Sequence, residues 1–155
     1  MSNWFKAKTL SSLEYSFCPS CKKKVGKQKS CSICKMPTIQ IVENQEHFEI
    51  EYFFGKKFMI EKNLSTDMLN WYDATNYAKN LRKGGFSGWR LPTIEELKII
   101  FEIKEALNID KSYEWLWSSE TLSDNQGHAW YMMMADGTLD DNDKMSGQLY
   151  VCCVR

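Results

Sequence analysis

Alternating apolar and polar residues predict a β-hairpin in the first half of the chain. Apolar side chains occupy every second position of residues 48–54, with Glu49 and Glu51 between them. A turn at residues 55–57 leads to residues 58–61, which continue the pattern as the second strand. The pattern therefore predicts two antiparallel strands with one buried face.

Helical spacing replaces this alternation further along the chain. Asn70 is a suitable N-cap for a first helix, which ends at the glycine pair 84–85. Thr93 and Glu96 match a T-x-x-E capping box, which predicts the start of a second helix. Apolar residues recur with helical periodicity from there to about residue 107.

The last third of the chain has strand-like patterns again. Apolar or alternating segments cover residues 113–118, 129–135 and 149–154, with a turn expected at Asp136-Gly137. Strands, then helices, then strands predict an α+β fold with two helices and a mainly antiparallel sheet.

Charge divides the chain into two parts. Residues 1–45 hold eight lysines and two glutamates, a net charge of +6. Residues 46–155 hold twelve basic and eighteen acidic residues, a net charge of −6. Such asymmetry is typical of two units with different surfaces. The basic unit suits contact with nucleic acid, with an acidic partner or with the acidic part of its own chain, or its lysines are simply solvated.

Composition is that of a globular protein, with 43% hydrophobic and 26% charged residues. The longest apolar run covers residues 129–135, far short of the roughly 20 residues that a membrane-spanning helix needs. The first residues lack the apolar core and cleavage site of a secretory signal. We therefore expect a soluble, cytoplasmic protein that does not contact membranes.

Four of the six cysteines form two CxxC motifs, Cys18-x-x-Cys21 and Cys31-x-x-Cys34. Each motif turns two thiolates toward one point, and two motifs supply the four sulfurs of a tetrahedral zinc site. The nine-residue spacer is shorter than usual but resembles that of compact zinc ribbons in bacterial proteins. Two disulfides, a rubredoxin-like iron site and a redox dithiol are the alternatives, and structural Zn²⁺ is favoured.

This spacing also predicts the domain organisation. Residues 1–36 form a segment with a four-cysteine zinc ribbon, which is too small to fold without metal, and residues 37–155 form the larger domain. No arginine precedes Arg82, so sequence-specific DNA recognition by the ribbon is not expected.

Several motifs of the larger domain occur in the order seen in a known family. They are Trp71-Tyr72-Asp73-Ala74, the stretch 85–93 with Glu96-Leu97, Trp117-Ser118-Ser119, Ala129-Trp130-Tyr131 and the closing Cys153-Val154-Arg155. Over residues 46–155 the chain resembles the Lcl C-terminal domain family. The resemblance implies a C-type-lectin-like fold, related to that of formylglycine-generating enzymes, in which an irregular loop region carries ligand contacts.

The motif residues have plain structural interpretations. An arginine at position 90 typically forks onto carbonyls or a carboxylate and fixes a loop. The tryptophans are expected to be core and loop anchors, although stacking on a sugar is the alternative. Arg155 is expected to form an ion pair through its guanidinium or its carboxylate. The set assigned to structural roles is Trp71, Trp89, Arg90, Leu91, Pro92, Thr93, Glu96, Trp117, Trp130 and Arg155.

The remaining polar residues give weak signals for chemistry. Cys152 and Cys153 are adjacent, so on a strand they point to opposite faces, one buried and one partly exposed. The acidic run Asp140, Asp141, Asn142 and Asp143 is a weak calcium candidate, with a solvated hairpin loop as the alternative. No phosphate loop, dinucleotide fingerprint or nucleophile elbow occurs.

Together these patterns predict a non-catalytic binding module. A lectin-like domain would present its loops to a protein or glycan ligand, and the zinc ribbon would serve for docking. The alternatives are an intracellular enzyme or redox factor that uses Cys152 or Cys153, and a nucleic-acid-associated factor that acts through the basic ribbon.

Overall fold

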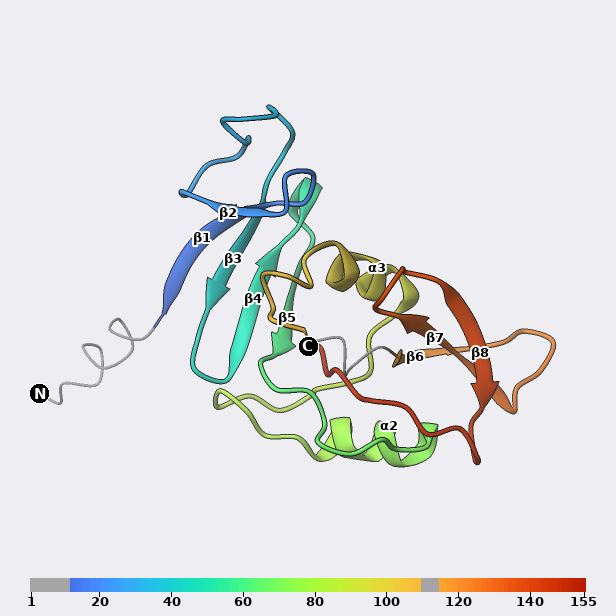
Figure 1. Ribbon diagram of the computed structural model, residues 1–155. Coiled ribbons are helices and arrows are strands. Elements are labelled where there is room, and N and C mark those ends of the chain that lie inside the picture. Colours follow the sequence, from blue (N-terminus) through green and yellow to red (C-terminus); the bar gives the residue numbers. More distant parts are fainter. Residues whose placement is uncertain (1–11, 110–114) are drawn as a thin grey trace, which may run out of the picture.

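The computed structural model describes residues 12–109 and 115–155, which form two antiparallel sheets and two helices (Figure 1). The larger sheet has the strand order β2-β1-β3-β4-β5 and the smaller one the order β6-β7-β8. The strands are β1 (Leu13–Cys18), β2 (Lys23–Val25), β3 (Ile39–Glu43), β4 (His47–Glu51), β5 (Lys57–Glu61), β6 (Trp115–Thr121), β7 (His128–Met133) and β8 (Leu139–Asp143). The helices are α2 (Trp71–Asn80) and α3 (Ile94–Glu102), and η1 (Phe53–Gly55) is a single 3₁₀ turn. The predicted α+β class is confirmed.

The predicted hairpin is β4 and β5, whose register pairs Phe48 with Ile60 and Ile50 with Phe58. Its first strand ends at Glu51, three residues earlier than predicted, because η1 forms the connection. These apolar side chains join a large core cluster with α3, β6 and β7. A second cluster lies around α2, Trp89 and Trp117.

Both helices begin where the sequence predicts. The Asn70 side chain accepts a hydrogen bond from the Asp73 amide, and Thr93 and Glu96 form the complete capping box. The first helix ends at Asn80, before the predicted stop at the glycine pair 84–85, and the second ends at Glu102 instead of about residue 107. Consecutive turns follow, and they still bury Ile103, Ala106 and Leu107, so the apolar periodicity extends beyond the helix. Among the described residues, neither helix is long and apolar enough to span a membrane.

The C-terminal segment lies between the two sheets (Figure 1). On one side its backbone pairs with residues 59–69, from Met59 with Arg155 to Leu69 with Leu149. On the other side it bonds to Arg90 and to residues 115–117. The predicted strand 149–154 is therefore a series of isolated bridges, because its partners are loops and strand ends rather than one continuous strand.

Strand β1 connects the cysteine-rich segment to the rest of the protein. It pairs with β2 on one side and with β3, from Leu13–Glu43 to Phe17–Ile39, on the other. Tyr15 and Phe17 are buried in the large core cluster. The predicted domain boundary between residues 36 and 37 thus separates β1 from β3, and these two strands pair in one sheet.

Gly84 approaches His47 closely, and we expect Gly84→Ala to destabilise the fold by about 2 kcal/mol or more. Gly84 has a φ of +61°, and a Cβ there would lie 2.5 Å from Nδ1 of the buried His47. The left-handed backbone alone costs an alanine about 1–2 kcal/mol. Gly85→Ala is the matched control, since φ is +79° but nothing lies within 4 Å. Urea unfolding measures both variants, and equal losses would show that the approach to His47 is not a constraint.

Candidate metal centre

The four cysteines of the two CxxC motifs come together at one end of the larger sheet. Their sulfur atoms all lie within 4.8 Å of one another. The Sγ atoms of Cys18 and Cys34 are 3.5 Å apart, and those of Cys21 and Cys31 are 3.9 Å apart. Within residues 12–109 and 115–155 this is the one group of three or more cysteine, histidine or acidic side chains close enough to bind a metal ion.

Local backbone geometry positions these thiols. Lys22 and Lys35 each follow the second cysteine of a motif, and both adopt left-handed φ angles, +55° and +62°. Amide hydrogen bonds from Cys34 and Ile33 lower the pKa of the Cys31 thiol to about 6. The Met36 amide likewise lowers the pKa of Cys34. Thiolates are thus favoured in the second motif, as a metal ligand requires.

The loop between the two motifs is tied to the sheet by one carbonyl group. Gln28 O accepts hydrogen bonds from Ser16 Oγ at 2.9 Å, from Gln40 Nε2 at 3.0 Å and from Thr38 Oγ1. The Gln28 amide donates back to Ser16 Oγ at 3.0 Å. Side chains of β1 and β3 therefore fix the loop that brings the second motif over the first.

The segment that carries the four cysteines also contacts the end of α3. Lys22 Nζ donates to the Glu102 carbonyl at 3.0 Å and lies 3.9 Å from the Glu105 carboxylate. A cation at a helix C-terminus interacts favourably with the unpaired carbonyls there. The Tyr15 hydroxyl donates to the Ala106 carbonyl at 3.4 Å in the same region.

The motif residues of the larger domain hold its interior together. Arg90 forks onto Glu96 with two bonds of 2.8 Å, and Glu96 Oε2 also accepts from the Thr93 amide. Leu91 and Pro92, between them, are buried.

The four motif tryptophans differ in burial. Trp89 and Trp117 are buried, and Trp117 Nε1 donates to the Leu69 carbonyl at 2.8 Å. Trp71 is half-buried and donates to the Ser118 carbonyl at 2.8 Å. Trp130 is also half-buried.

Arg155 makes contacts other than the predicted ion pair. Its Nε donates to the Ser87 carbonyl at 2.7 Å, and its guanidinium carbon lies 4.9 Å from the centroid of the Phe86 ring. A cation–π contact of this kind needs no carboxylate. The residue closes the loop that precedes Trp89.

Cys152 and Cys153 belong to different core clusters, as expected for neighbours on an extended segment. Both are fully buried, so the expectation of one partly exposed thiol was wrong. Burial raises the pKa of both thiols. The Cys153 amide donates to the buried Glu61 carboxylate at 2.8 Å, and Lys83 lies 3.4 Å from the other carboxylate oxygen. Sequence reasoning missed Glu61, because its partner lies 92 residues away.

The acidic run 140–143 is part of β8, not a hairpin loop. It pairs with β7, which sets successive side chains on opposite faces. Asp141 accepts from His128 Nδ1 at 2.7 Å, and Asp140 Oδ1 accepts from the Asp141 amide at 2.9 Å. Asp143 Oδ1 accepts from two amides of the following turn, and these bonds lower the pKa of its carboxyl group. Protein donors therefore engage all three carboxylates.

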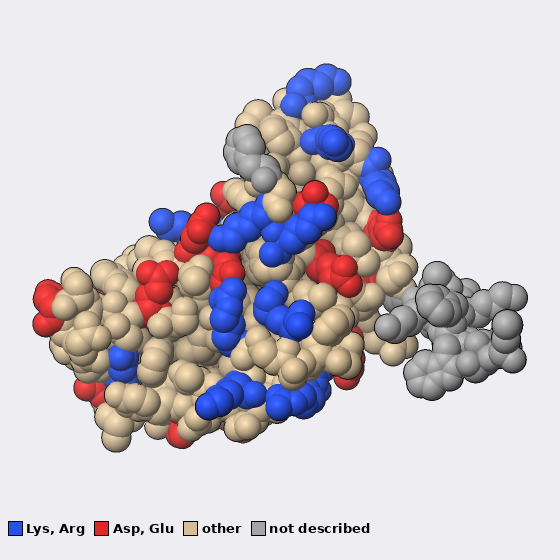
Figure 2. Space-filling view, turned by 180° about the vertical axis from the view of Figure 1, so that it is seen from behind, with Lys and Arg blue, Asp and Glu red and all other residues tan. Residues whose placement is uncertain are grey.

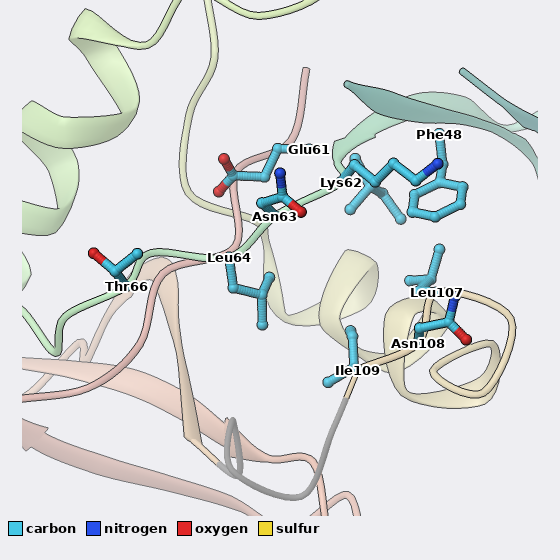
Figure 3. A pocket seen from close by; sticks show the side chains of 10 residues that line it. Phe48, Glu61, Lys62, Asn63, Leu64, Thr66, Leu107, Asn108 and Ile109 are labelled. Atoms are coloured by element: carbon cyan, nitrogen blue, oxygen red, sulfur yellow. The ribbon is translucent and has the colours of Figure 1, made fainter. Parts of the chain in front are cut away.

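A pocket of about 460 Å³ lies between the end of β5 and the turns after α3 (Figure 3). Its apolar lining comes from Phe48, Ile60, Leu64, Leu107 and Ile109, and its polar lining from Glu61, Lys62, Asn63, Thr66 and Asn108. The Glu61 carboxylate points away from Ile109 and Leu107 in this view. Lys62 pairs with Glu43 at 2.6 Å, so uncharged groups dominate the polar part.

The two buried carboxylates are expected to give opposite pH dependences of stability. Burial raises the pKa of Glu96, but the Arg90 and Thr93 hydrogen bonds outweigh it and the net pKa is lowered. A lowered folded-state pKa gives stability that is present above the unfolded pKa, about 4.3, and is lost as pH falls through the folded value. Burial raises the net pKa of Glu61, so stability is lost as pH rises above about 4.3.

Urea unfolding of Glu96→Gln and Glu61→Gln from about pH 3 to 8 tests this expectation. Relative to wild type, Glu96→Gln should flatten the loss of stability on the acid side. Glu61→Gln should flatten the loss of stability that begins above about pH 4.3, and its amide oxygen still accepts the Cys153 bond. Parallel curves for all three proteins would contradict the assigned interactions.

Comparison with known proteins assigns the larger domain. No curated protein matches the chain in sequence. The family model of the Lcl C-terminal domain matches residues 35–155, eleven residues more at the N-terminal side than the motifs alone indicated. The match includes β3, β4 and β5 as well as both helices and the smaller sheet. This chain belongs to the Lcl C-terminal domain family.

Proposed function

We propose that the four-cysteine centre is a structural zinc site. Zinc–thiolate bonds of about 2.3 Å in a tetrahedron place sulfurs roughly 3.8 Å apart, close to the 3.5 and 3.9 Å separations found here. Four thiolates complete the coordination, which leaves no position for water or substrate. This closed donor set is the observation that carries the proposal: the metal stabilises the fold and does not take part in a reaction.

We infer that the protein is a non-catalytic binding module with a C-type-lectin-like domain. The alternative, a redox factor, would need an accessible thiol of low pKa outside the metal centre. Cys152 and Cys153 are fully buried and their pKa values are raised, which disfavours that alternative. Free thiols at all six cysteines fit a reducing compartment, and we propose the cytoplasm.

We assign the ligand to the pocket beside β5 (Figure 3). Irregular segments supply much of its wall, including Asn63, Leu64, Thr66 and residues 107–109, as a loop-based binding surface would require. Its volume of about 460 Å³ lies in the range of small-ligand sites. Asn63 and Asn108 carboxamides beside apolar side chains suit an uncharged ligand with hydroxyl or amide groups, in a glycan or a peptide.

Metal analysis tests the first part of this proposal. Protein purified under reducing conditions should contain one zinc per chain, and a colorimetric chelator should release it only after the thiols are blocked. Protein with no zinc, or with iron and its charge-transfer absorption, would overturn the assignment.

NMR titration tests the second part. Isotopically labelled protein is titrated with neutral oligosaccharides and with uncharged peptides, and shifts are expected at residues 61–66 and 107–109. Asn63→Ala should weaken binding at least fivefold, whereas the exposed Asn76→Ala control should not. Shifts confined to another surface, or turnover of the ligand, would contradict the proposal.

A further inference from the structure

Residues 19–37, here called the basic lobe, project from the end of the larger sheet (Figure 1). They contain six lysines and no acidic residue. Figure 2 shows only Lys and Arg among the charged side chains on the projecting part of the lobe, while side chains of both charges lie at its base and on the body. The lobe lies almost entirely before residues 35–155, so its surface is an addition to the family domain.

Three of the lysines are engaged with the rest of the protein. Lys22 contacts the end of α3, Lys24 lies 4.0 Å from Glu43, and Lys27 lies 2.5 Å from Glu14. These contacts orient the lobe on the sheet.

The other three lysines point their charge to solvent. Lys23 and Lys29 are exposed and have no ion pair or hydrogen bond of the side chain within the part of the chain that the structure describes. Among the described residues, Lys35 Nζ bonds only to the Ser32 carbonyl of its own turn, at 2.8 Å. Ile33 and Met36, which are 66% and 52% exposed, lie in the same turn. The exposed side chains of the lobe thus include three ammonium groups without an acidic partner among the described residues, and two apolar side chains.

We propose that the basic lobe binds the phosphodiester backbone of nucleic acids without sequence preference. Lysine is a point charge on a flexible stem, which suits phosphates and reads no base. The lobe has neither the arginine that base recognition uses nor an aromatic side chain for stacking. Ile33 and Met36 suit contact with sugars and base edges in a shallow groove.

An acidic protein is the less favoured occupant. Protein interfaces are depleted in lysine and enriched in aromatic residues and arginine, the opposite of this surface. The net charge of the lobe also suits a polyanion: six lysines, with the two negative charges of Zn²⁺ and four thiolates, leave about +4. Residues 46–155 carry a net charge of −6, so the lobe is the part of the chain whose net charge favours a polyanion.

Fluorescence anisotropy tests this inference. The inference rests on the proposed function, because it takes the basic lobe to be folded around a bound metal ion. The metal-loaded full chain is titrated with a labelled DNA duplex of about 20 base pairs and with a single-stranded RNA of about 20 nucleotides, from roughly 25 to 200 mM NaCl. Three phosphate contacts predict a slope of log K against log salt of about −3. A triple variant with Lys23→Gln, Lys29→Gln and Lys35→Gln should bind at least tenfold more weakly at about 50 mM NaCl, with a slope near zero.

A second triple variant controls for net charge. Lys57→Gln, Lys79→Gln and Lys98→Gln alter exposed lysines outside the lobe by the same number of charges, and binding should stay within twofold of wild type. Equal losses in both variants, or no binding to either nucleic acid at about 25 mM NaCl, would overturn the inference. So would poly-L-glutamate that competes as well as DNA per unit charge, since this would identify an acidic protein as the partner.

The affinities for the DNA duplex and for the single-stranded RNA show which nucleic acid the lobe binds. Tighter binding of the duplex assigns DNA, and tighter binding of the single strand assigns RNA; both support the phosphodiester backbone as the ligand. Zinc content is measured on each variant. If the proteins contain no zinc, the structural-zinc proposal is refuted. The nucleic-acid inference is still tested in that case, because the lysine variants and the wild type are compared at the same metal content.

Discussion

Cys18→Ser is expected to destabilise the whole chain, not only the cysteine-rich segment. Cys18 is the last residue of β1, which pairs with both β2 and β3. Structural zinc contributes roughly 10–16 kcal/mol of binding free energy in small zinc-dependent peptides. We therefore expect the loss of one zinc ligand to lower the stability more than any single truncation in the core does. Release of the metal would free the end of a strand whose Tyr15 and Phe17 belong to the large core cluster.

Hydrogen exchange with mass spectrometry measures this effect, since it reports on β3 and β4 separately from the metal-binding loops. In Cys18→Ser we expect faster exchange in β3 and β4 and a melting temperature lowered by about 10 °C or more. Cys152→Ser is the control: it makes the same cysteine-to-serine change at a core position outside the four-cysteine cluster, and it should keep one metal ion per chain. Wild-type protection of β3 and β4 in Cys18→Ser would instead show that residues 1–36 unfold independently.

Trp117→Ala is expected to lower the free energy of unfolding by about 3–5 kcal/mol, the range for truncation of a buried aromatic side chain. Trp117 is fully buried, and its indole donates to the Leu69 carbonyl at 2.8 Å. It packs edge-on against Tyr131 in the cluster around α2. The truncation therefore creates a cavity and also leaves a carbonyl group without its donor.

Trp115→Ala provides the matched control for this truncation. Trp115 lies on the same strand two residues earlier, but it is 43% exposed. We expect a loss of about 1 kcal/mol or less in urea unfolding, because surface substitutions away from specific contacts change stability little. Similar losses for the two variants would refute the structural role assigned to Trp117.

Local patterns explain what the sequence predicted well. The capping box of α3 needs only Thr93 and Glu96, three residues apart, and the β4–β5 hairpin needs only alternation on either side of one turn. The four sulfurs come from two short motifs, each of which turns its own thiols toward the same point. In these cases the partners are close in the chain, so spacing specifies geometry.

Long-range pairing was decided by the tertiary structure alone. Glu61 accepts the amide of Cys153 from the far end of the chain, and the acidic residues 140–143 form an edge strand because β7 pairs with them. The segment 149–155 finds partners in loops on both sides, which no periodicity encodes.

The position of β1 shows the physical reason most directly. The cysteine motifs set residues 1–36 apart from the rest, and the charge changes sign near residue 45, so a division of the chain follows from the sequence alone. Backbone hydrogen bonds in a sheet are independent of side-chain charge, and burial of Tyr15 and Phe17 favours pairing with β3. The sequence by itself determined the two CxxC motifs and the local elements, while the tertiary structure decided that the strand carrying Cys18 and the family domain share one sheet and one core.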